Sequence, residues 1–416
     1  MTQPFDPTRE AALAALADFL PRAGRDYAQD RNHDRGPGDR SNVSALSPYL
    51  RHRLVTEPEV IEAVLARHSR AASEKFVQEV YWRTYWKGWL ELRPEAWRRY
   101  RRDVDALVPE IGVAEWSDGY ARACEARTGI DCFDAWVTEL AEFGYLHNHT
   151  RMWFASIWIF TLVLPWQLGA DLFYRGLLDG DAASNTLSWR WVAGLQTAGK
   201  TYLARPDNIR RYTEGRFSPT ALASSAPALS EAPLPPAMAL QPVAMVPQGA
   251  TGLLLHEEDL HPESLALGGA TVTAIASWHR AADRSPLGSS DLVDAFTSAA
   301  VDDGLARASA HFGVDGTALG TEATTASSTA SPSDDAAAVL AWARESGVTT
   351  IVTPFAPVGP VRERFDAMAG ELASAGLTLS VVRRQWDESA WPYAGRGFFP
   401  FRERIPRLLA EQGIGA

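Results

Sequence analysis

The feature that most constrains the fold is a change of pattern in the middle of the chain. The segment from Ser218 to Gly249, SPTALASSAPALSEAPLPPAMALQPVAMVPQG, is rich in proline, alanine and serine, and its apolar residues follow neither helical nor strand spacing. This composition is typical of a linker between separately packed units. We therefore predict two units, residues 1–217 and 250–416, joined by a linker at 218–249, and the 416 residues are enough for both.

The first unit shows helical periodicity. Apolar residues recur at spacings of three and four in PTREAALAALADFLPRA, in EPEVIEAVLARHSRAASEKFVQEVYWRTYWKGWLEL and in CFDAWVTELAEFGYLHNHTRMWFASIWIFTLVL. Such spacing predicts amphipathic helices. Residues 1–217 are therefore expected to form an all-α domain.

The second unit alternates two patterns. The β-rich runs GLLLH, TVTAIAS, TTIVTPF and LTLSVVR are separated by the helical patterns SDLVDAFTSAAVDDGLARASAHF, DAAAVLAWARES and VRERFDAMAGELASAG. This order predicts a smaller, doubly wound α/β domain at 250–416. It has no GxGxxG or P-loop motif, so no nucleotide is indicated there. We expect Gly320 to Asp335 to form a low-complexity surface insertion.

Composition excludes several classes of protein. No apolar run is long enough to span a bilayer and no secretory leader is present, so we expect a cytoplasmic protein with no membrane partner. The two cysteines, Cys124 and Cys132, suit neither a disulfide framework nor a metal site. Residues 1–217 carry 28 Lys and Arg against 29 Asp and Glu, so the net charge of −11 arises mainly after them. An acidic chain argues against broad nucleic-acid binding but leaves room for a local basic groove.

Two motifs in the helical half combine acids with indoles, and eleven of the fifteen tryptophans lie before residue 192. Glu79, Trp82 and Arg83 share one helix face, on which the acid and the arginine can pair. In DGDAASNTLSWRWVAG (179–194), an acid, an amide and an indole follow one another at intervals of four. Each pattern alone also fits an ordinary role as an ion pair, a helix cap or a core residue.

Taken in order, the motifs between Tyr27 and Phe217 resemble the FAD-binding helical domain of DNA photolyases and cryptochromes. The matching segments are DYAQDR, VSALSPYL, FVQEVYWRTYW, TGIDCFDAW, GYLHNHTRMWFAS, and the 179–194 motif preceded by LPWQLGADLFYRGLL. The resemblance implies a photolyase-like helical fold and FAD as the cofactor.

The resemblance also implies how FAD would be bound. Ser44 and Ser47 would donate hydrogen bonds to the pyrophosphate, and Arg83 would neutralise its charge. Further implied cofactor contacts are Tyr27, Leu46, Phe76, Tyr145 and Asn148.

At the isoalloxazine ring, the resemblance implies a polar set of four side chains. Arg151 would pair with Asp179 beside the ring, and Asp181 would accept a hydrogen bond from its polar edge. Asn185 would face N5, where an amide can accept or donate as the protonation of the nitrogen changes.

The resemblance further implies light-driven repair of a pyrimidine dimer, with residues for each task. Indoles would stack on the lesion, an acid would hydrogen-bond it and neighbours would complete the wall; this catalytic set is Glu79, Trp82, Asn148, Met152 and Trp191. Electrons would reach the flavin through Trp189 and Trp166, with Trp116 as the candidate third member at a shorter spacing than the family's usual pattern. Contacts to damaged DNA are assigned to His149, Arg98, Arg210 and Arg211.

Departures from the family pattern keep a second function open. His149 stands where repair enzymes commonly carry an arginine, and Val43 and Thr84 replace the usual threonine and acid. Family members normally carry an α/β antenna domain before the helices, whereas TTIVTPFAPVGPVRERFDAMAGELASAGLTLSVV and FFPFRERI resemble the late part of that domain, which favours a rearranged order; no antenna chromophore is indicated.

We therefore weigh three functions. The first is a photolyase. The second is a cryptochrome-like photoreceptor that signals through a protein partner without repairing DNA. The third, a helical domain that has lost flavin, would leave the Asp179, Asp181 and Asn185 set without a purpose.

Overall fold

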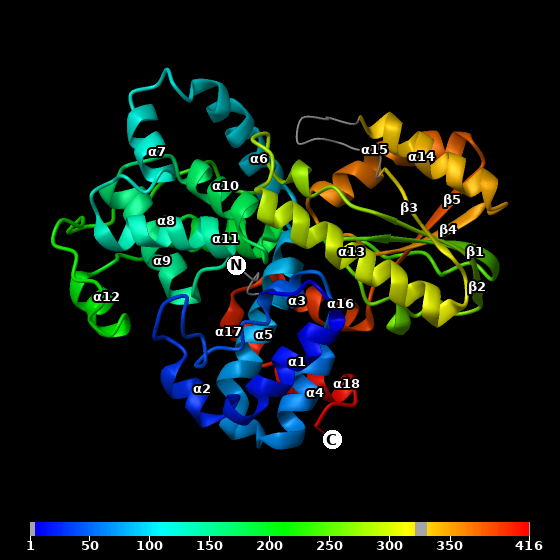
Figure 1. The fold of residues 1–416 in the computed structure, drawn as a ribbon, viewed down its shortest axis with the longest axis horizontal. Helices are drawn as coiled ribbons and strands as arrows, with labels where there is room; N and C mark the ends of the chain where they lie inside the picture. Colours follow the sequence, from blue (N-terminus) through cyan, green and yellow to red (C-terminus); the bar gives the residue numbers. More distant parts are fainter. Residues whose placement is uncertain (1–4, 321–330, 416) are drawn as a thin grey trace.

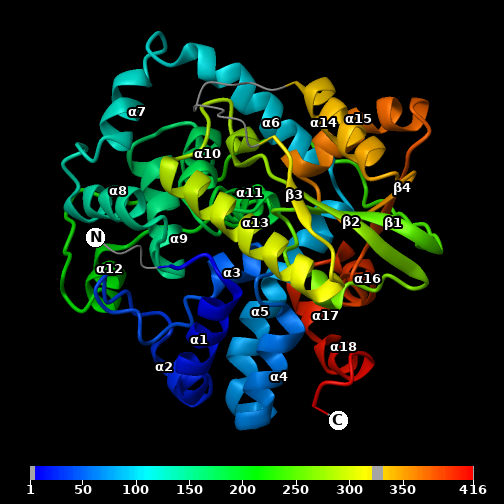
Figure 2. The same ribbon diagram turned by 45° about the vertical axis from the view of Figure 1, so that its right-hand side comes forward.

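The computed structural model describes residues 5–320 and 331–415. A helical region and an α/β region lie side by side and share an extensive interface (Figures 1 and 2). The insertion expected at Gly320 to Asp335 falls largely outside the described residues.

Helices form the described chain before the linker. Their bounds are α1 (Arg9–Phe19), α2 (Arg25–Asp30), α3 (Ser47–Arg51), α4 (Glu57–Arg67), α5 (Arg70–Glu91), α6 (Glu95–Leu107), α7 (Ser117–Cys124), α8 (Asp131–Phe143), α9 (Asn148–Ser156), α10 (Trp166–Gly176), α11 (Ala182–Val192) and α12 (Pro206–Tyr212). A π-helical turn, Ile157–Thr161, follows α9. Every described strand begins at Gly249 or later, in agreement with the helical spacing.

Helix α5 is the central element of this region. The apolar pattern from Glu57 to Leu92 forms two helices because Ser69 caps α5, its hydroxyl accepting a hydrogen bond from the Ala72 amide. With 22 residues, α5 is about 33 Å long. Helices α2, α4 and α11 pack around it, so its side chains can serve several surfaces at once.

The α/β region is a three-layer structure. Its parallel sheet has the strand order β3-β2-β1-β4-β5. The bounds are β1 (Gly249–His256), β2 (Ala270–Trp278), β3 (Gly316–Ala318), β4 (Thr350–Pro354) and β5 (Thr378–Val382), with helices α13 (Asp291–Phe312), α14 (Pro332–Glu345) and α15 (Pro360–Ser374). The doubly wound expectation is consistent with this arrangement, although the sequence pattern missed the short strand β3.

Alternation along β1 explains how both faces are covered. Leu254 packs with the apolar side chains of α14 and α15, whereas Leu253 and Leu255 pack toward Ala308 of α13. Figure 2 shows α13 on one side of the sheet and α14 with α15 on the other. Burial on both faces is the normal condition of a parallel sheet.

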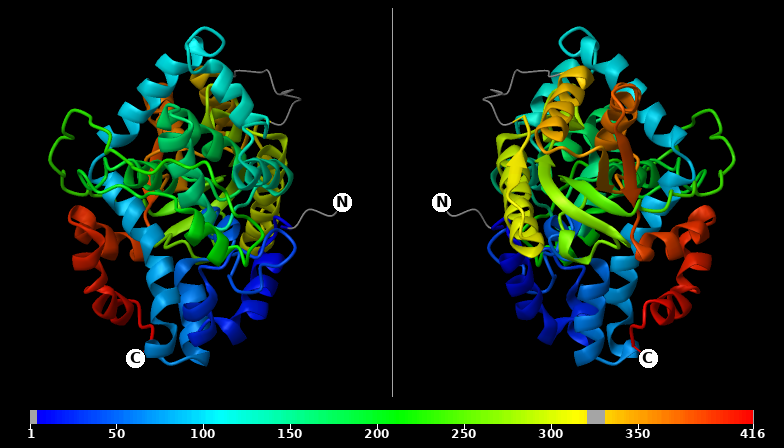
Figure 3. Two further views of the ribbon diagram at one scale, coloured as in Figure 1. Left: turned by 90° about the vertical axis from the view of Figure 1, so that its left-hand side faces the viewer. Right: turned by 90° about the vertical axis from the view of Figure 1, so that its right-hand side faces the viewer.

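The last helices of the chain return to the helical region. They are α16 (Gln385–Ala390), α17 (Phe398–Arg402) and α18 (Ile405–Glu411). Figure 3 shows this segment, drawn red, beside the pale blue helices α4 and α5. The Trp386 indole donates a hydrogen bond to the Thr84 hydroxyl at 2.9 Å, and the Tyr85 hydroxyl donates to the Arg396 carbonyl at 2.8 Å. The helical core therefore includes residues well beyond the linker.

The carboxyl end of β1 meets the helical region through buried charges. The segment HEEDLH (256–261) starts at the last residue of β1 and contacts Arg51. The Arg51 guanidinium donates to both carboxylate oxygens of Glu258 at 2.7 and 2.8 Å. Arg53 donates to Asp259 at 3.1 Å and to Asp387 at 2.6 Å. Open α/β sheets commonly bind ligands at this edge, but here the chain from α3 packs against the end of β1.

Among the described residues, no helix combines the length and the apolar character needed to cross a membrane.

Candidate functional site

Two arginine–aspartate pairs lie where α11 begins. Arg151 of α9 donates to Asp179 at 2.9 Å, and Arg83 of α5 donates to Asp181 at 2.8 Å. Both carboxyl groups are buried. Burial alone would raise each pKa, but the charge of the paired arginine brings the pKa of Asp179 and of Asp181 below the ordinary value. Both acids are therefore ionised at neutral pH.

The loop that carries these acids is held in place by its backbone. Asp181 is the N-cap of α11, because its Oδ1 accepts hydrogen bonds from the amides of Ala183 at 3.0 Å and Ser184 at 2.7 Å. The carbonyl of Gly180 accepts a hydrogen bond from Arg51 Nε at 2.8 Å. A Cβ at position 180 would lie 2.8 Å from the carbonyl oxygen of Tyr174, so only glycine fits between the two acids.

The turn before α3 brings two hydroxyl groups to the same place. Ala45 has a φ of 50°, a left-handed conformation that tightens the turn between Ser44 and Ser47. Leu46 is fully buried beneath it. The hydroxyl of Ser47 is among the groups that lower the pKa of Asp179, which places the turn beside the acidic loop.

Aromatic side chains and one amide complete the surroundings. The rings of Tyr27 and Phe76 meet edge to face at 5.2 Å, and the Arg151 guanidinium lies 5.6 Å from the centre of the Tyr145 ring. Asn185 donates from its amide nitrogen to the Ala170 carbonyl at 2.7 Å. This bond fixes which end of the amide is the oxygen, so Asn185 presents an acceptor away from α10.

Glu79 and Arg83 do not pair with each other as their spacing suggested. Arg83 forms an ion pair with buried Asp181, and Glu79 instead faces Arg31, whose Nε lies 3.7 Å from the carboxylate. A charge-assisted bond to a buried carboxylate is stronger than an ion pair along a helix surface. Burial raises the pKa of Glu79, with Arg31 opposing that rise.

Trp82 and Trp191 are both partly exposed indoles with an aromatic partner. Trp82 stacks on Phe398 of α17, with ring centroids 3.5 Å apart and planes 11° from parallel. Trp191 lies 5.8 Å from the Tyr202 ring. Asn148 is exposed at the start of α9, and Met152 is half-buried one turn later. Helix α11 contacts both α5 and α9, so these side chains come from three adjoining helices.

Comparison with known proteins identifies this region. Residues 76–218 match the sequence family described as the FAD binding domain of DNA photolyase. This part of the chain belongs to the photolyase/cryptochrome family. FAD is accordingly the cofactor of the photolyase domain.

Individual relatives agree with the family match. Proteins named deoxyribodipyrimidine photo-lyase from Streptomyces griseus and Thermus thermophilus are each 32% identical to this chain, over 48% and 47% of it. The matched part is 45% of each relative, so the chain spans less than half the length of the curated relatives it matches. Among solved structures, a cryptochrome from Synechocystis aligns with a TM-score of 0.42 at 22% identity, over 51% of this chain and 46% of that one.

The residues of the photolyase domain fit FAD. Asp179 Oδ1 is buried and has no hydrogen-bond partner within residues 5–320 and 331–415. A buried acceptor of this kind calls for a donor, and the isoalloxazine ring of FAD carries an imide N–H. The hydroxyls of Ser44 and Ser47 are donors suited to phosphate oxygens.

The tryptophans named for electron transfer fall into two separate groups. Trp189 is buried and meets the ring of Trp158 at 6.2 Å, and Trp116 meets Tyr120 at 6.2 Å. Trp158 and Tyr120 in turn lie 6.0 Å apart. Trp166 instead neighbours Tyr100 at 5.9 Å.

The residues named for DNA binding are not gathered on one surface. His149 is 8% exposed and stacks on Trp153 at 4.1 Å, with its ring nitrogens facing the Asn32 carbonyl and the Tyr202 hydroxyl. Its imidazole is thus engaged within the protein. Arg210 and Arg211 are exposed on α12 and Arg98 on α6, and Figure 1 shows these two helices well apart.

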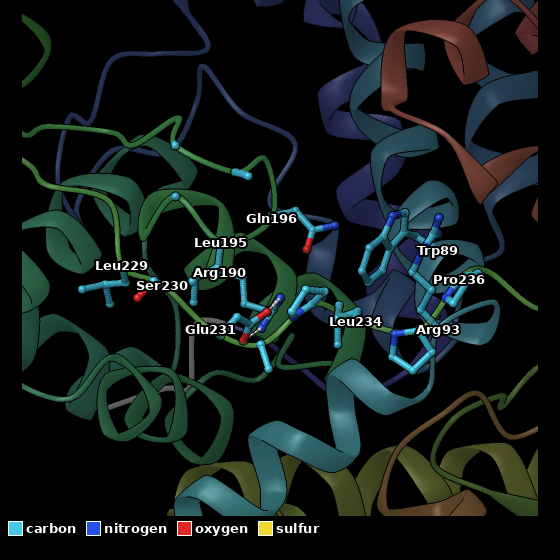
Figure 4. Close-up of a pocket in the computed structure, with 16 residues that line it drawn as sticks. Trp89, Arg93, Arg190, Leu195, Gln196, Leu229, Ser230, Glu231, Leu234 and Pro236 are labelled. Atoms are coloured by element: carbon cyan, nitrogen blue, oxygen red, sulfur yellow. Dashed lines mark hydrogen bonds and ion pairs between the residues drawn. The ribbon is translucent and has the colours of Figure 1, made fainter.

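A pocket of about 560 Å³ lies at the ends of α5 and α11, under part of the linker (Figure 4). We call residues 229–236 the linker strap. Glu231 of the strap forms an ion pair with buried Arg190, and the Leu229 amide donates to the Ala193 carbonyl at 3.0 Å. Arg99 also donates to the Ala232 carbonyl. The predicted linker is therefore docked on the helices rather than extended into solvent.

Sequence reasoning missed several residues that define this region. Trp158 and Tyr120 looked like core positions because apolar periodicity explains them, and Arg51 and Phe398 lie outside the compared motifs or in the other half of the chain. The one available signal was the density of aromatic residues around α7 and α9.

Proposed function

We propose that the protein is a light-driven DNA photolyase, which uses FAD to repair pyrimidine dimers. The observation that carries the proposal is the arrangement along α5. Glu79 and Trp82 lie within one helical turn of Arg83, and Arg83 is bonded to Asp181 at the acidic loop. Groups suited to a lesion and groups suited to the flavin are therefore adjacent on one helix.

Each side chain then has a task in the proposed reaction. FAD, when bound and reduced, supplies light-driven one-electron chemistry. Asp179, Asp181 and Asn185 would hold the ring, Arg151 keeps Asp179 ionised, and the turn with Ser44 and Ser47 would hold the pyrophosphate. Among the remaining implied contacts, Tyr27, Leu46, Phe76 and Tyr145 would surround the cofactor.

Glu79 would act on the lesion as a hydrogen-bond donor. Its raised pKa favours the protonated form, and a carboxylic acid can donate to a carbonyl oxygen on which negative charge develops. Trp82 would offer the indole face that Phe398 does not cover, and Trp191 would form the opposite wall with Asn148 and Met152 beside it. Flat aromatic surfaces suit a pyrimidine dimer that has been extruded from the base stack.

The test is repair of an oligonucleotide that contains one thymine dimer, under blue light and reductant. Glu79→Ala should slow repair by about 10² and leave the amount of bound FAD unchanged, whereas Glu79→Gln, which keeps a donor, should lose less. Glu62→Gln, an exposed acid on α4, is the matched control. A colourless protein, or repair that is unchanged in Glu79→Ala, would contradict the proposal.

A cryptochrome-like photoreceptor is the second candidate, and two observations favour it. His149, at a position expected to contact DNA, is buried among protein groups. Arg51 joins Gly180, between the two flavin-site acids, to Glu258 of the α/β region, which would connect a light-induced change to a signalling partner. A yellow protein that is photoreduced but leaves the dimer intact would support this candidate over repair.

A further inference from the structure

We propose that Trp158 and Tyr120 complete the electron relay of this protein, in the order Trp189, Trp158, Tyr120, Trp116, with Trp166 outside it. The inference rests on the FAD-binding part of the proposed function and is independent of DNA repair. It assigns a role to two residues that resemblance alone leaves in the hydrophobic core.

The relay consists of three similar contacts. Ring centroids are 6.2 Å apart from Trp189 to Trp158, 6.0 Å from Trp158 to Tyr120 and 6.2 Å from Tyr120 to Trp116, and all three pairs meet edge to face. Trp189, Trp158 and Tyr120 are buried, and Trp116 is partly exposed. The contacts thus lead from the flavin-side helix α11 to the surface at α7.

Gly169 of α10 shows that the first contact is built into the packing. A Cβ at position 169 would overlap the six-membered ring of Trp189 and would lie 2.8 Å from Trp158. The helix interior disfavours glycine by about 1 kcal/mol relative to alanine. The close approach of two indoles gives a physical reason for accepting that cost.

The surroundings of the indole N–H groups favour migration of the radical cation from the buried tryptophans to Trp116 at the surface. An oxidised indole becomes a strong N–H acid, and it stays a mobile radical cation only where no base removes the proton. The Trp158 N–H donates to the Pro165 carbonyl at 2.9 Å, and the Trp189 N–H has no partner within residues 5–320 and 331–415. Neither buried indole faces a base, whereas Trp116 can release its proton to water.

Tyr120 serves as the bridge between two indoles. Burial raises the pKa of its phenol, and its hydroxyl faces the thiol of Cys124 rather than a carboxylate or imidazole. Loss of the phenolic proton is therefore disfavoured, and so is a lasting tyrosyl radical. The ring itself provides the contact between Trp158 and Trp116.

The alternative branch through Trp166 stays inside the protein. Trp166 meets Tyr100, and Tyr100 meets Trp97 at 5.4 Å. Both Tyr100 and Trp97 are 1% exposed, and the Trp97 N–H donates to Glu363 at 2.7 Å. This branch ends at Trp97, a ring that is buried against α15.

The electrons and protons of the relay balance. Trp189 would give one electron to light-excited, oxidised FAD, which is the oxidant, and would then be reduced by Trp158; Trp116 would reduce Trp158 across Tyr120. Trp116 loses its indole proton to water. An external thiol, the reductant, returns one electron and one proton to Trp116, so the net transfer is one electron from thiol to FAD.

The test compares Trp158→Phe with its matched control Trp166→Phe, using Trp189→Phe as the reference for a broken relay. Photoreduction of bound FAD in blue light with a thiol should fall in Trp158→Phe to the level of Trp189→Phe and remain near wild type in Trp166→Phe. Tyr120→Phe, which keeps the ring, should retain the rate, and Tyr120→Leu should lose it. The reverse ranking of the Trp158 and Trp166 variants would overturn the proposal.

Two further readouts separate the relay from folding and from repair. In flash spectroscopy, Trp116→Phe, a surface change, should abolish the long-lived deprotonated tryptophan radical even if a core variant fails to fold; persistence of that radical would count against the relay. In the FAD-free protein, far-ultraviolet circular dichroism should lose the exciton contribution of the Trp158 and Trp189 pair in Trp158→Phe and keep it in Trp166→Phe, whereas the closer pairs Trp82 with Trp86 and Trp136 with Trp153 contribute equally in both variants. Repair by chemically reduced enzyme, measured separately, reports on the proposed function alone.

Discussion

Replacing Arg51 by methionine should both destabilise the protein and weaken FAD binding. Arg51 is 1% exposed and makes three hydrogen bonds, two to Glu258 at 2.7 and 2.8 Å and one to the Gly180 carbonyl at 2.8 Å. The variant leaves Glu258 buried and unpaired, which typically costs about 3–5 kcal/mol. Because Gly180 lies between the two acids of the flavin site, the affinity for FAD should fall as well.

The size of the effect can be worked out for a thermal melt. An unfolding entropy of about 2.1 cal/mol/K per residue gives about 0.9 kcal/mol/K for the 416-residue chain. A loss of about 4 kcal/mol then lowers Tm by about 5 °C if the chain unfolds as one unit. Calorimetry of the FAD-free and FAD-bound protein measures this shift directly.

A double variant tests the cause. Arg51→Met with Glu258→Leu should recover most of the loss. A single variant within about 1 kcal/mol of wild type, or a double variant no better than the single, would refute the reasoning.

Three smaller predictions follow from local geometry. Ala45→Gly relieves the left-handed φ of 50° and should raise the free energy of unfolding by about 0.5–1 kcal/mol in denaturant melts; a loss of stability would show that the turn is unstrained. Burial is the main cause that raises the pKa of Glu139 to about 7, and the nearby negative charge of Asp34 adds to it. The free energy of unfolding should therefore decline as pH rises toward about 7, and Glu139→Gln should flatten that decline in melts taken over the same pH range. Trp97→Phe removes the N–H that donates to Glu363 across the interface; because Glu363 is exposed and can bond to water instead, the lost hydrogen bond should cost about 0.5–1.5 kcal/mol, whereas the exposed Arg98→Gln should change the melt little.

Local patterns were sufficient for elements whose cause is local. The run SDLVDAFTSAAVDDGLARASAHF predicted the helix found at Asp291–Phe312, with Ser290 as its N-cap, because its spacing and cap both lie within the segment. The strand Gly316–Ala318 was missed because three partly exposed residues carry no alternation. Propensity over so short a segment cannot compete with the pairing to β2 that defines the strand.

The candidate site divides in the same way. The pair of Arg151 with Asp179 was expected from the motif match, and the structure contains it. Helix spacing alone predicted Glu79 as the partner of Arg83, and this prediction was wrong. The choice between Glu79 and Asp181 depends on burial that only the tertiary fold creates. The contact between Arg51 and Glu258 spans 207 positions, and no local pattern reports such a pairing.

The packing of the last helices against α5 has a consequence for synthesis of the protein. A ribosome completes α5 some 300 positions before Trp386, Phe398 and their neighbours, which cover its Tyr81, Trp82 and Thr84 surface. Throughout elongation the nascent chain therefore presents an aromatic stripe that has no native cover, a state that invites chaperone binding or aggregation. Translation arrested near residue 384 should yield a chain that remains bound to a chaperone, because α5 is fully packed only after the last helices have left the ribosome.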